Sequence, residues 1–378
     1  MKMTNVFKED EKAVYKLREL YREYGYSHYK VSKFEEYDLY ANNKNFLVSE
    51  KLLTFTDTNG KLMALKPDVT LSIIKNAVAD AKASYRLYYD EHVYRTPIGG
   101  DGFREITQMG LESIGNLDTY AQSEVIMLAI KSMESISDDC ILDISHMKFL
   151  EGLLENAGID SKDMSAFFKL IESKNIPELR TLCEKWNVSP EWQANICKIT
   201  SMYLPIDKAI EEIKNIVAGE KMQIAYDDIC EIYKALECYS LCKRVYLDFS
   251  IVNDMNYYDG VIFKGFINGI PDGILSGGRY DRLMERFGKK TEAIGFAVYL
   301  DKLERFGMSN EEYDVDVMIV YDSDMPTEKI IESINAFKAD NKTVKAVNAV
   351  DRSVKCRQYF SLTKDGELRE ANDKYSAS

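Results

Sequence analysis

The sequence predicts an α+β protein, in which an antiparallel sheet flanked by helices is interrupted by a helical insertion and followed by a small α/β domain. Three observations predict this fold class. Helix and strand patterns alternate over the first 145 residues with turns typical of antiparallel hairpins, only helical apolar spacing is found from 147 to 243, and strand patterns return after that. Consecutive strands that are joined by short turns pair in antiparallel fashion.

The first region begins with an amphipathic charged helix within residues 1–25 and continues as hairpins. The expected strands of this region are residues 52–56, 62–66, 85–94 and 103–114. The turn Asp57-Thr58-Asn59-Gly60 joins the first two, and a glycine-rich loop joins the other two. Between these hairpins, residues 71–78 have helical apolar spacing, and Asp68 or Thr70 is placed to cap that helix.

The middle of the chain changes its pattern twice. Residues 147–243 carry apolar side chains at a spacing of three to four, which predicts helices only and therefore an insertion. Strand patterns then return at 246–251 and 261–267. We interpret Gly277-Gly278 as a loop that opens a short helix from Asp281, so that the sheet is completed after the interruption.

The last part of the chain is expected to be a separate small domain. A polar segment precedes a strand–helix–strand pattern, formed by residues 315–321, a helix from Pro326 and residues 343–347. We therefore expect a core domain of residues 1–306, which contains the insertion, and a small α/β domain of residues 312–378.

The composition narrows the class of function. The formal net charge of −13 leaves no basic field to drive non-specific nucleic-acid binding. The seven cysteines form no C-x-x-C pair, so we expect reduced core thiols in a cytoplasmic protein. Three histidines far apart in the chain provide no metal site or catalytic triad, and neither a metal nor a cofactor is expected. No apolar run is long enough to predict a membrane anchor.

Residues 103–115 hold the most informative candidate for a binding site. Side chains alternate along a strand, so Gln108, Gly110 and Glu112 share one face and would line a polar hole that suits an ammonium group or an imidazole ring. The alternative is a surface strand whose polar face meets water. Arg95 could clamp a carboxylate or a phosphate, or it could be an exposed hairpin arginine.

Several motifs in a fixed order point to a family. They are Leu65-Lys66-Pro67-Asp68-Val69-Thr70, Tyr94-Arg95, Gln108-x-Gly110-x-Glu112, Asn256-Tyr257-Tyr258, Gly277-Gly278-Arg279-Tyr280-Asp281 and Ile294-Gly295-Phe296-Ala297. This series, spread over about residues 5–305, resembles that of histidyl-tRNA synthetase. The resemblance implies the class II aminoacyl-tRNA synthetase fold, usually dimeric, and a histidine-binding pocket. By resemblance, the pocket residues are Asp68, Thr70, Arg95, Gln108, Glu112, Tyr258 and Tyr280.

Other positions depart from the synthetase pattern. Asn253 stands where the synthetase has a catalytic arginine, Lys302 replaces an ATP-binding arginine, and Tyr299 fills a glycine position. Lysine cannot reproduce the bidentate grip of a guanidinium on phosphate. Losing one preorganised charge-stabilising donor typically costs about 10²- to 10³-fold in rate, so the loss of several is expected to abolish adenylate formation.

A synthetase-like chain without these cations resembles the regulatory subunits of ATP phosphoribosyltransferase. The resemblance implies a subunit that is not catalytic alone and that forms a dimer within a hetero-oligomer. Its partner would be a short-form catalytic subunit, which joins ATP to phosphoribosyl pyrophosphate in the first step of histidine biosynthesis. Free histidine would be the effector, and no tRNA would be bound, because the C-terminal unit is shorter than an anticodon-binding domain.

Two alternatives for the function stay open at this point. One is an active, divergent histidine-tRNA ligase, and the other is a stand-alone histidine-binding sensor. The place where histidine binds, in the synthetase-like pocket or at a subunit interface, also stays open.

Overall fold

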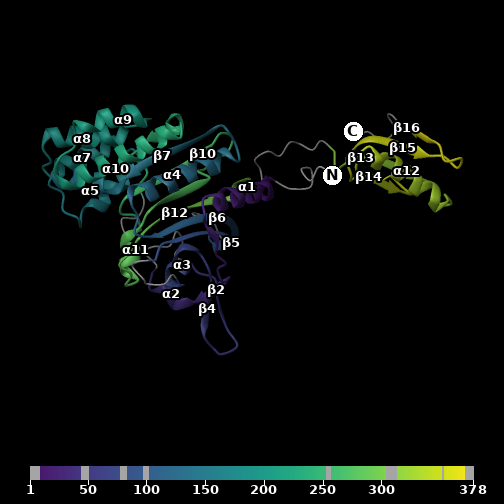
Figure 1. The fold of residues 1–378 in the computed structure, drawn as a ribbon, viewed down its shortest axis with the longest axis horizontal. Coiled ribbons are helices and arrows are strands. Elements are labelled where there is room, and N and C mark those ends of the chain that lie inside the picture. The colour runs from purple at the N-terminus through teal and green to yellow at the C-terminus, as the bar shows by residue number, and fades with distance from the viewer. Residues whose placement is uncertain are drawn as a thin grey trace. The chain divides into compact units, whose positions relative to one another are not determined.

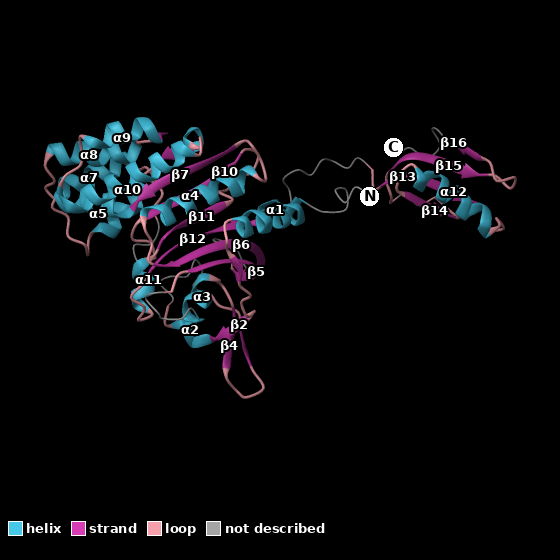
Figure 2. Cartoon of the chain, viewed as in Figure 1, coloured by secondary structure: helices cyan, strands magenta, loops and turns pink. Residues whose placement is uncertain are grey.

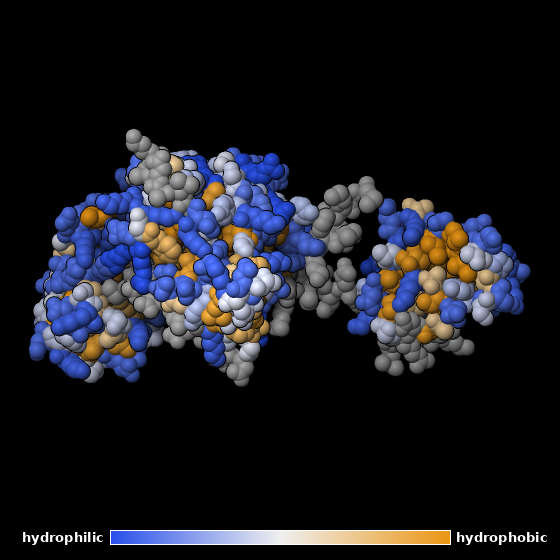
Figure 3. All heavy atoms as spheres, turned by 90° about the horizontal axis from the view of Figure 1, so that it is seen from below, coloured by the Kyte–Doolittle hydropathy of each residue, from blue (hydrophilic) through white to orange (hydrophobic). Residues whose placement is uncertain are grey.

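The structure, a computed structural model, describes residues 9–43, 51–76, 83–96, 102–252, 257–303, 313–350 and 353–370. The chain forms two compact units, residues 1–306 and residues 307–378 (Figure 1). In the view of Figure 3 the surface of each unit is largely hydrophilic, with hydrophobic side chains gathered in patches. None of the helices described has the length and apolar character needed to cross a membrane.

A nine-stranded sheet forms the centre of the first unit, in the order β1-β5-β6-β12-β11-β10-β7-β9-β8 (Figure 2). Its strands are β1 (Ser27–His28), β5 (Tyr85–Arg95), β6 (Arg104–Gly115), β7 (Cys140–His146), β8 (Leu204–Pro205), β9 (Val245–Leu247), β10 (Val261–Ile267), β11 (Leu275–Arg279) and β12 (Glu292–Tyr299). All pairs from β5 to β7 are antiparallel, whereas β1 pairs with β5 and β7 with β9 in parallel. The predicted antiparallel sheet is confirmed, with parallel pairs toward both edges.

Helices cover both faces of this sheet. They are α1 (Glu9–Glu23), α2 (Tyr37–Ala41), α3 (Thr70–Asn76), α4 (Thr119–Glu134) and α11 (Asp281–Arg286). Helices α1 and α4 share a hydrophobic core with Met109, Leu111 and Phe296, which project from one face. Helices α2, α3 and α11 pack with Tyr89 and Ile114 on the other face. The candidate side chains of β6 project from this second face, because Gln108 and Glu112 have the same parity as Ile114.

The segment between β7 and β9 consists mainly of helices, which lie together at the β7–β9 end of the sheet (Figure 1). They are α5 (Met147–Asn156), α6 (Met164–Glu172), α7 (Ile176–Lys185), α8 (Pro190–Ser201), α9 (Ile206–Lys214) and α10 (Gly219–Cys238), followed by the 3₁₀ turn Cys242–Arg244. The prediction of helices only is wrong at one point, because β8 pairs with β9 as an edge strand. Two residues are too few to show an alternating pattern.

Two further predictions are wrong in detail. Gly277 and Gly278 lie inside β11 rather than in a loop. A Cβ on Gly277 would lie 2.4 Å from the Gly295 carbonyl oxygen, and a Cβ on Gly278 would lie 2.7 Å from the Tyr258 ring. Glycine serves close packing there instead of a turn. The strand expected at 246–251 ends at Leu247, because the Asp248 carboxylate accepts the Ser250 amide in a turn.

A small antiparallel sheet, in the order β2-β4-β3, extends the first unit next to α2 (Figure 1). Its strands are β2 (Phe34–Glu36), β3 (Thr54–Thr56) and β4 (Leu62–Leu65). The predicted hairpin is confirmed, and its turn closes where Asp57 Oδ1 accepts the backbone amides of Asn59 and Lys61, each at 2.8 Å. Gly60 has a φ of +79°, which an L side chain rarely adopts.

The second unit is a four-stranded sheet with one helix. Its elements are β13 (Val315–Tyr321), α12 (Thr327–Ala339), β14 (Val344–Val347), β15 (Cys356–Leu362) and β16 (Leu368–Glu370), and the strand order is β14-β13-β15-β16. Val317, Ile319 and Leu362 form its core, and Phe337 of α12 packs on it. The strand–helix–strand pattern is confirmed, while β15 and β16 were not predicted.

Candidate functional site

The polar face of β6 is buried in the middle of the sheet. Gln108 and Glu112 are each 2% exposed, so the alternative of a strand face that meets water is wrong. In the register of β6 with β12, Gln108 lies opposite Tyr299 and Glu112 lies opposite Gly295. Groups that the sequence places in different motifs therefore lie on one face of the sheet.

Glycines make room for the side chains of this site. A Cβ on Gly295 would lie 1.8 Å from Oε2 of Glu112, so only glycine leaves space for that carboxyl group. A Cβ on Gly110 would lie 2.2 Å from the Tyr89 ring. The space over Gly110, predicted to be a ligand hole, is filled by this tyrosine of β5. The sequence prediction missed Tyr89 because its position depends on the pairing of β5 with β6.

Glu112 is at the centre of the site. Thr70 Oγ1 donates to its Oε1 at 2.7 Å, and the Tyr280 hydroxyl donates to its Oε2 at 2.5 Å. Burial raises the pKa of Glu112 to about 8, although both hydroxyl donors act in the opposite direction. The carboxyl group is therefore mostly protonated at neutral pH, and a ligand that donates a hydrogen bond or carries a positive charge would favour its ionised form.

Asp68 and Arg95 form a second pair. Asp68 Oδ1 accepts the Leu71 amide at 2.8 Å and so caps α3, one of the two predicted options. Nε of Arg95 donates to the Pro67 carbonyl oxygen at 2.6 Å, and its Nη2 lies 3.6 Å from Asp68 Oδ2. Arg95 is 8% exposed, so the interpretation as an exposed hairpin arginine is wrong. Burial raises the pKa of Asp68 despite the neighbouring Arg95.

Tyrosine rings form a wall of the site. The Tyr257 ring lies edge-to-face against Tyr258 at 4.5 Å between centroids and 6.0 Å from Tyr280. Burial raises the pKa of all three phenols, so they remain neutral hydrogen-bonding groups. Tyr257 was not among the predicted site residues, although the motif that contains it was recognised.

Gln108 has an unsatisfied group in this site. Its side-chain Nε2 is buried and makes no hydrogen bond within the part of the chain that the structure describes. Most buried polar atoms in native proteins have a partner, so an unpaired donor in a polar site indicates a ligand or water acceptor.

The structure brings most of the predicted pocket residues into contact. Thr70, Glu112 and Tyr280 are hydrogen-bonded, and Asp68 pairs with Arg95. The Tyr258 ring contacts Tyr257, which in turn contacts Tyr280. Asn253, Asn256 and residues 97–101 of the glycine-rich loop before β6 lie outside the described residues.

In the other half of the site that the resemblance implies, Tyr299 and Lys302 make contacts within the chain. The Tyr299 hydroxyl lies 2.7 Å from Ser276 Oγ. Lys302 Nζ donates to the Gly273 carbonyl oxygen at 2.7 Å and lies 5.1 Å from the centre of the Tyr299 ring. Burial lowers the pKa of Lys302. This ammonium group is engaged with its own backbone and with an aromatic ring, which is a poor arrangement for holding a phosphate.

No group of three or more His, Cys, Asp or Glu side chains within the described ranges is arranged to hold a metal ion. The polar groups of these site residues are carboxyls, a carboxamide, a guanidinium and hydroxyl groups. Such a set can bind a small zwitterion by hydrogen bonds and charge.

The family follows from this fold and from a direct match. Residues 5–303 match the model of the family described as Histidyl-tRNA synthetase. The chain therefore belongs to the histidyl-tRNA synthetase family.

Two similar curated proteins have a more specific name than the family. The chain is 30% identical over 315 residues to the ATP phosphoribosyltransferase regulatory subunit of Acetivibrio thermocellus, covering 81% of this chain and 75% of that protein. It is 32% identical over 309 residues to the protein of the same name from Clostridium novyi, covering 79% and 73%.

Solved structures show the same fold. One of an ATP phosphoribosyltransferase regulatory subunit/histidyl-tRNA synthetase from Bacillus halodurans matches with a TM-score of 0.73 at 24% identity, covering 91% of each chain. A histidyl-tRNA synthetase from Nostoc matches with a TM-score of 0.71 at 16% identity, covering 96% of this chain and 93% of that one. A chain of the ATP phosphoribosyl transferase (HisG:HisZ) complex from Thermotoga maritima matches with a TM-score of 0.62 at 18% identity, covering 78% of this chain and 98% of that one.

Proposed function

We propose that this chain is the non-catalytic regulatory subunit of ATP phosphoribosyltransferase, which acts with a short-form catalytic subunit in the first step of histidine biosynthesis. The observation that carries this conclusion is the identity of 30% and 32% to curated proteins of that name over about four fifths of the chain. The bonds of Tyr299 and Lys302 to Ser276 and Gly273 agree with a chain that does not form an adenylate.

Reconstitution tests this function directly. Addition of the full chain to a purified short-form catalytic subunit is expected to raise the rate at which ATP and phosphoribosyl pyrophosphate are joined, whereas the chain alone is inactive. Histidine-dependent exchange of pyrophosphate into ATP is the second assay. Robust exchange by the purified chain would show an active histidine-tRNA ligase and contradict the proposal. Failure to associate with any such catalytic subunit would favour the stand-alone sensor.

We further propose that free histidine, as an effector, binds in the pocket around Glu112. The support is the buried Glu112 carboxyl, whose hydrogen-bond donors among the described residues are neutral hydroxyls, and Nε2 of Gln108, which has no partner among those residues. The variants Glu112→Ala and Gln108→Ala are expected to reduce inhibition of the reconstituted complex by histidine. Asp143→Asn is a matched control, because Asp143 is also a buried carboxyl but contacts Tyr203, outside the pocket. Unchanged histidine sensitivity in both pocket variants would favour an effector site at the subunit interface.

We also propose that the chain forms a dimer within the hetero-oligomer. Phe34 and Phe55 on the small sheet are 46% and 37% exposed, and their rings meet edge-to-face at 5.5 Å between centroids. An exposed aromatic pair of this kind is typical of a surface that is covered in an assembly. Light scattering of the wild type and of Phe34→Ser checks this: the wild type is expected to have twice the monomer mass, and the variant a lower mass.

Finally, we propose that the subunit acts in the cytoplasm without binding tRNA. All seven cysteines lie in the described part of the chain and are free thiols, as is usual in a reducing compartment. The net charge of −13 opposes binding to a phosphate backbone. A mobility-shift titration with histidine tRNA at low salt is expected to show no complex, and a complex of micromolar affinity would contradict this part of the proposal.

A further inference from the structure

We infer that Arg279 is a positioning residue for the effector pocket: from the opposite face of the sheet it fixes the backbone that carries Tyr280 and connects it to α4. This inference rests on the proposed binding of histidine next to Glu112 and adds a residue that does not itself touch the pocket.

The alternation of side chains along β11 places Arg279 behind the pocket. Gly278 faces the Tyr258 ring, and Tyr280 returns to the pocket, where its hydroxyl bonds Glu112. Arg279 lies between them and projects to the other face, where its side chain packs against Gly260. Arg279 is thus adjacent to Tyr280 in sequence, but its side chain lies on the other face of the sheet from the Tyr280 side chain.

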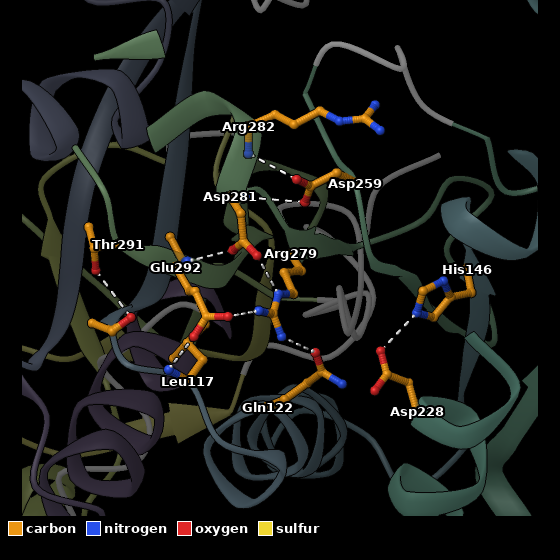
Figure 4. Close-up of polar contacts among 12 residues, drawn as sticks. Leu117, Gln122, His146, Asp228, Asp259, Arg279, Asp281, Arg282, Thr291 and Glu292 are labelled. Atoms are coloured by element: carbon orange, nitrogen blue, oxygen red, sulfur yellow. Dashed lines mark hydrogen bonds and ion pairs between the residues drawn. The ribbon is translucent and has the colours of Figure 1, made fainter. Parts of the chain in front are cut away.

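The guanidinium of Arg279 uses three nitrogens for three different elements (Figure 4). Nε donates to Asp281 Oδ2 at 2.7 Å in α11, and Nη1 donates to Gln122 Oε1 at 3.3 Å in α4. Nη2 donates to Oε1 of Glu292 in β12. The arginine side chain is 16% exposed, so these bonds are largely shielded from water. A planar fork of donors suits this arrangement, and a lysine ammonium does not.

The acceptors of these bonds are themselves fixed to the backbone. Oδ1 of Asp281 accepts the Ala293 amide at 2.9 Å, and Oε2 of Glu292 accepts the Leu117 amide at 2.8 Å, just before α4 begins (Figure 4). The Tyr280 amide donates to the Ala293 carbonyl oxygen at 2.8 Å. The Asp281 carboxylate thus also holds β12, to which Tyr280 is bonded, and the Glu292 carboxylate ties β12 to Leu117 before α4.

The position of Tyr280 matters because its hydroxyl contacts Glu112 at hydrogen-bond distance. Binding groups work only when held within about 0.5 Å of their productive positions, and this requires support from residues behind them. Loss of the Arg279 contacts leaves the segment held by the backbone bonds of Tyr280 and Asp281 to Ala293 and Asp259, without its side-chain link to α4, and we expect the Tyr280 hydroxyl to shift from its place next to Glu112. We expect Arg279→Ala to weaken histidine binding by about tenfold, the usual scale for removing a supporting partner.

A double-mutant cycle on the full chain tests this role. Histidine affinity is measured by titration calorimetry for the wild type, Arg279→Ala, Tyr280→Phe and the double variant. If Arg279 acts through Tyr280, its removal costs about tenfold in the wild-type background and little once the hydroxyl is gone. Arg282→Ala is the matched control: this arginine of α11 bonds Glu151 at 3.1 and 3.3 Å, and its loss should leave the affinity unchanged.

Partner variants keep the test decisive if Arg279→Ala does not fold. Gln122→Ala removes one acceptor, and Glu292→Gln removes the negative charge of another together with one of its two accepting oxygens. Each is expected to lower histidine affinity severalfold when Tyr280 is present but not in the Tyr280→Phe background. An unchanged affinity, or equal losses in both backgrounds, overturns the role of Arg279. Failure of the wild-type chain, alone and in the complex, to bind histidine overturns the effector pocket itself and is thus distinguishable.

Discussion

The two halves of the synthetase-like site differ in what their polar side chains bond. In the half around Glu112, Gln108 Nε2 is buried without a partner among the described residues, and the carboxyl is held only by neutral hydroxyl groups. In the other half, Lys302 and Tyr299 are bonded to the chain itself. A pocket that keeps unsatisfied polar groups is prepared for a ligand, whereas one whose groups bond each other is not. The side chains around Glu112 are therefore better suited to a ligand than those around Lys302.

The largest expected effect comes from removing the carboxyl of Glu112. Glu112→Ala leaves the hydroxyls of Thr70 and Tyr280 without the buried carboxyl that accepts from both. A bound cation would ionise Glu112, and truncating one partner of a buried charge pair costs about 2–5 kcal/mol, so histidine binding is expected to weaken by about 30-fold or more. Titration calorimetry with histidine measures this directly. A loss of histidine affinity below about threefold would contradict the view that the residues around Glu112 bind a ligand and those around Lys302 do not.

The second effect is a dependence of stability on pH. Burial raises the pKa of Glu112 from 4.5 to about 8, so the folded chain retains a proton that the unfolded chain has lost between these values. The folded state then binds more protons, and the free energy of unfolding decreases as pH rises from about 4.5 to about 8. Glu112→Gln cannot titrate and is expected to show a flatter profile of melting temperature against pH.

The control for this pH effect is Asp143→Asn. Burial raises the pKa of Asp143 to about 7, which has the same sign but ends one unit lower. Asp143→Asn should flatten the profile of melting temperature against pH only below about pH 7. The decrease in melting temperature between pH 7 and 8 should remain. Coincident profiles for the wild type and Glu112→Gln would contradict the assignment of the titrating group.

The smallest effect is expected in the filled half. Tyr299→Phe removes the hydroxyl bonded to Ser276 and keeps the ring under Lys302, so the free energy of unfolding should fall by about 1 kcal/mol. Histidine affinity should not change, because this hydroxyl bonds Ser276 and is not one of the two hydroxyls that donate to Glu112. Chemical denaturation and calorimetry measure the two quantities. A change of tenfold in histidine affinity would show that the two halves are coupled.

Local signals in the sequence predicted local structure well. The Asp68 cap of α3 and the turn at Asp57 are made within a few residues of the side chain that forms them, so a short window contains the cause. Gly277 and Gly278 were misassigned to a loop because the atoms that require glycine, on Gly295 and Tyr258, come from other segments. Tyr89 was missed for the same reason, since only strand pairing brings it over Gly110.

The sequence by itself determined the family, through the order of its motifs, and the face of β6 on which Gln108 and Glu112 project, through the two-residue period of a strand. Only the tertiary structure decided what that face meets. Glu112 bonds Thr70 and Tyr280 across separations of 42 and 168 residues, and Arg279 joins elements as far apart as 157 residues. The two-residue period of a strand specifies on which side of the backbone a side chain projects. Its burial and its bonding partners depend on which distant segments the register of the sheet places next to it.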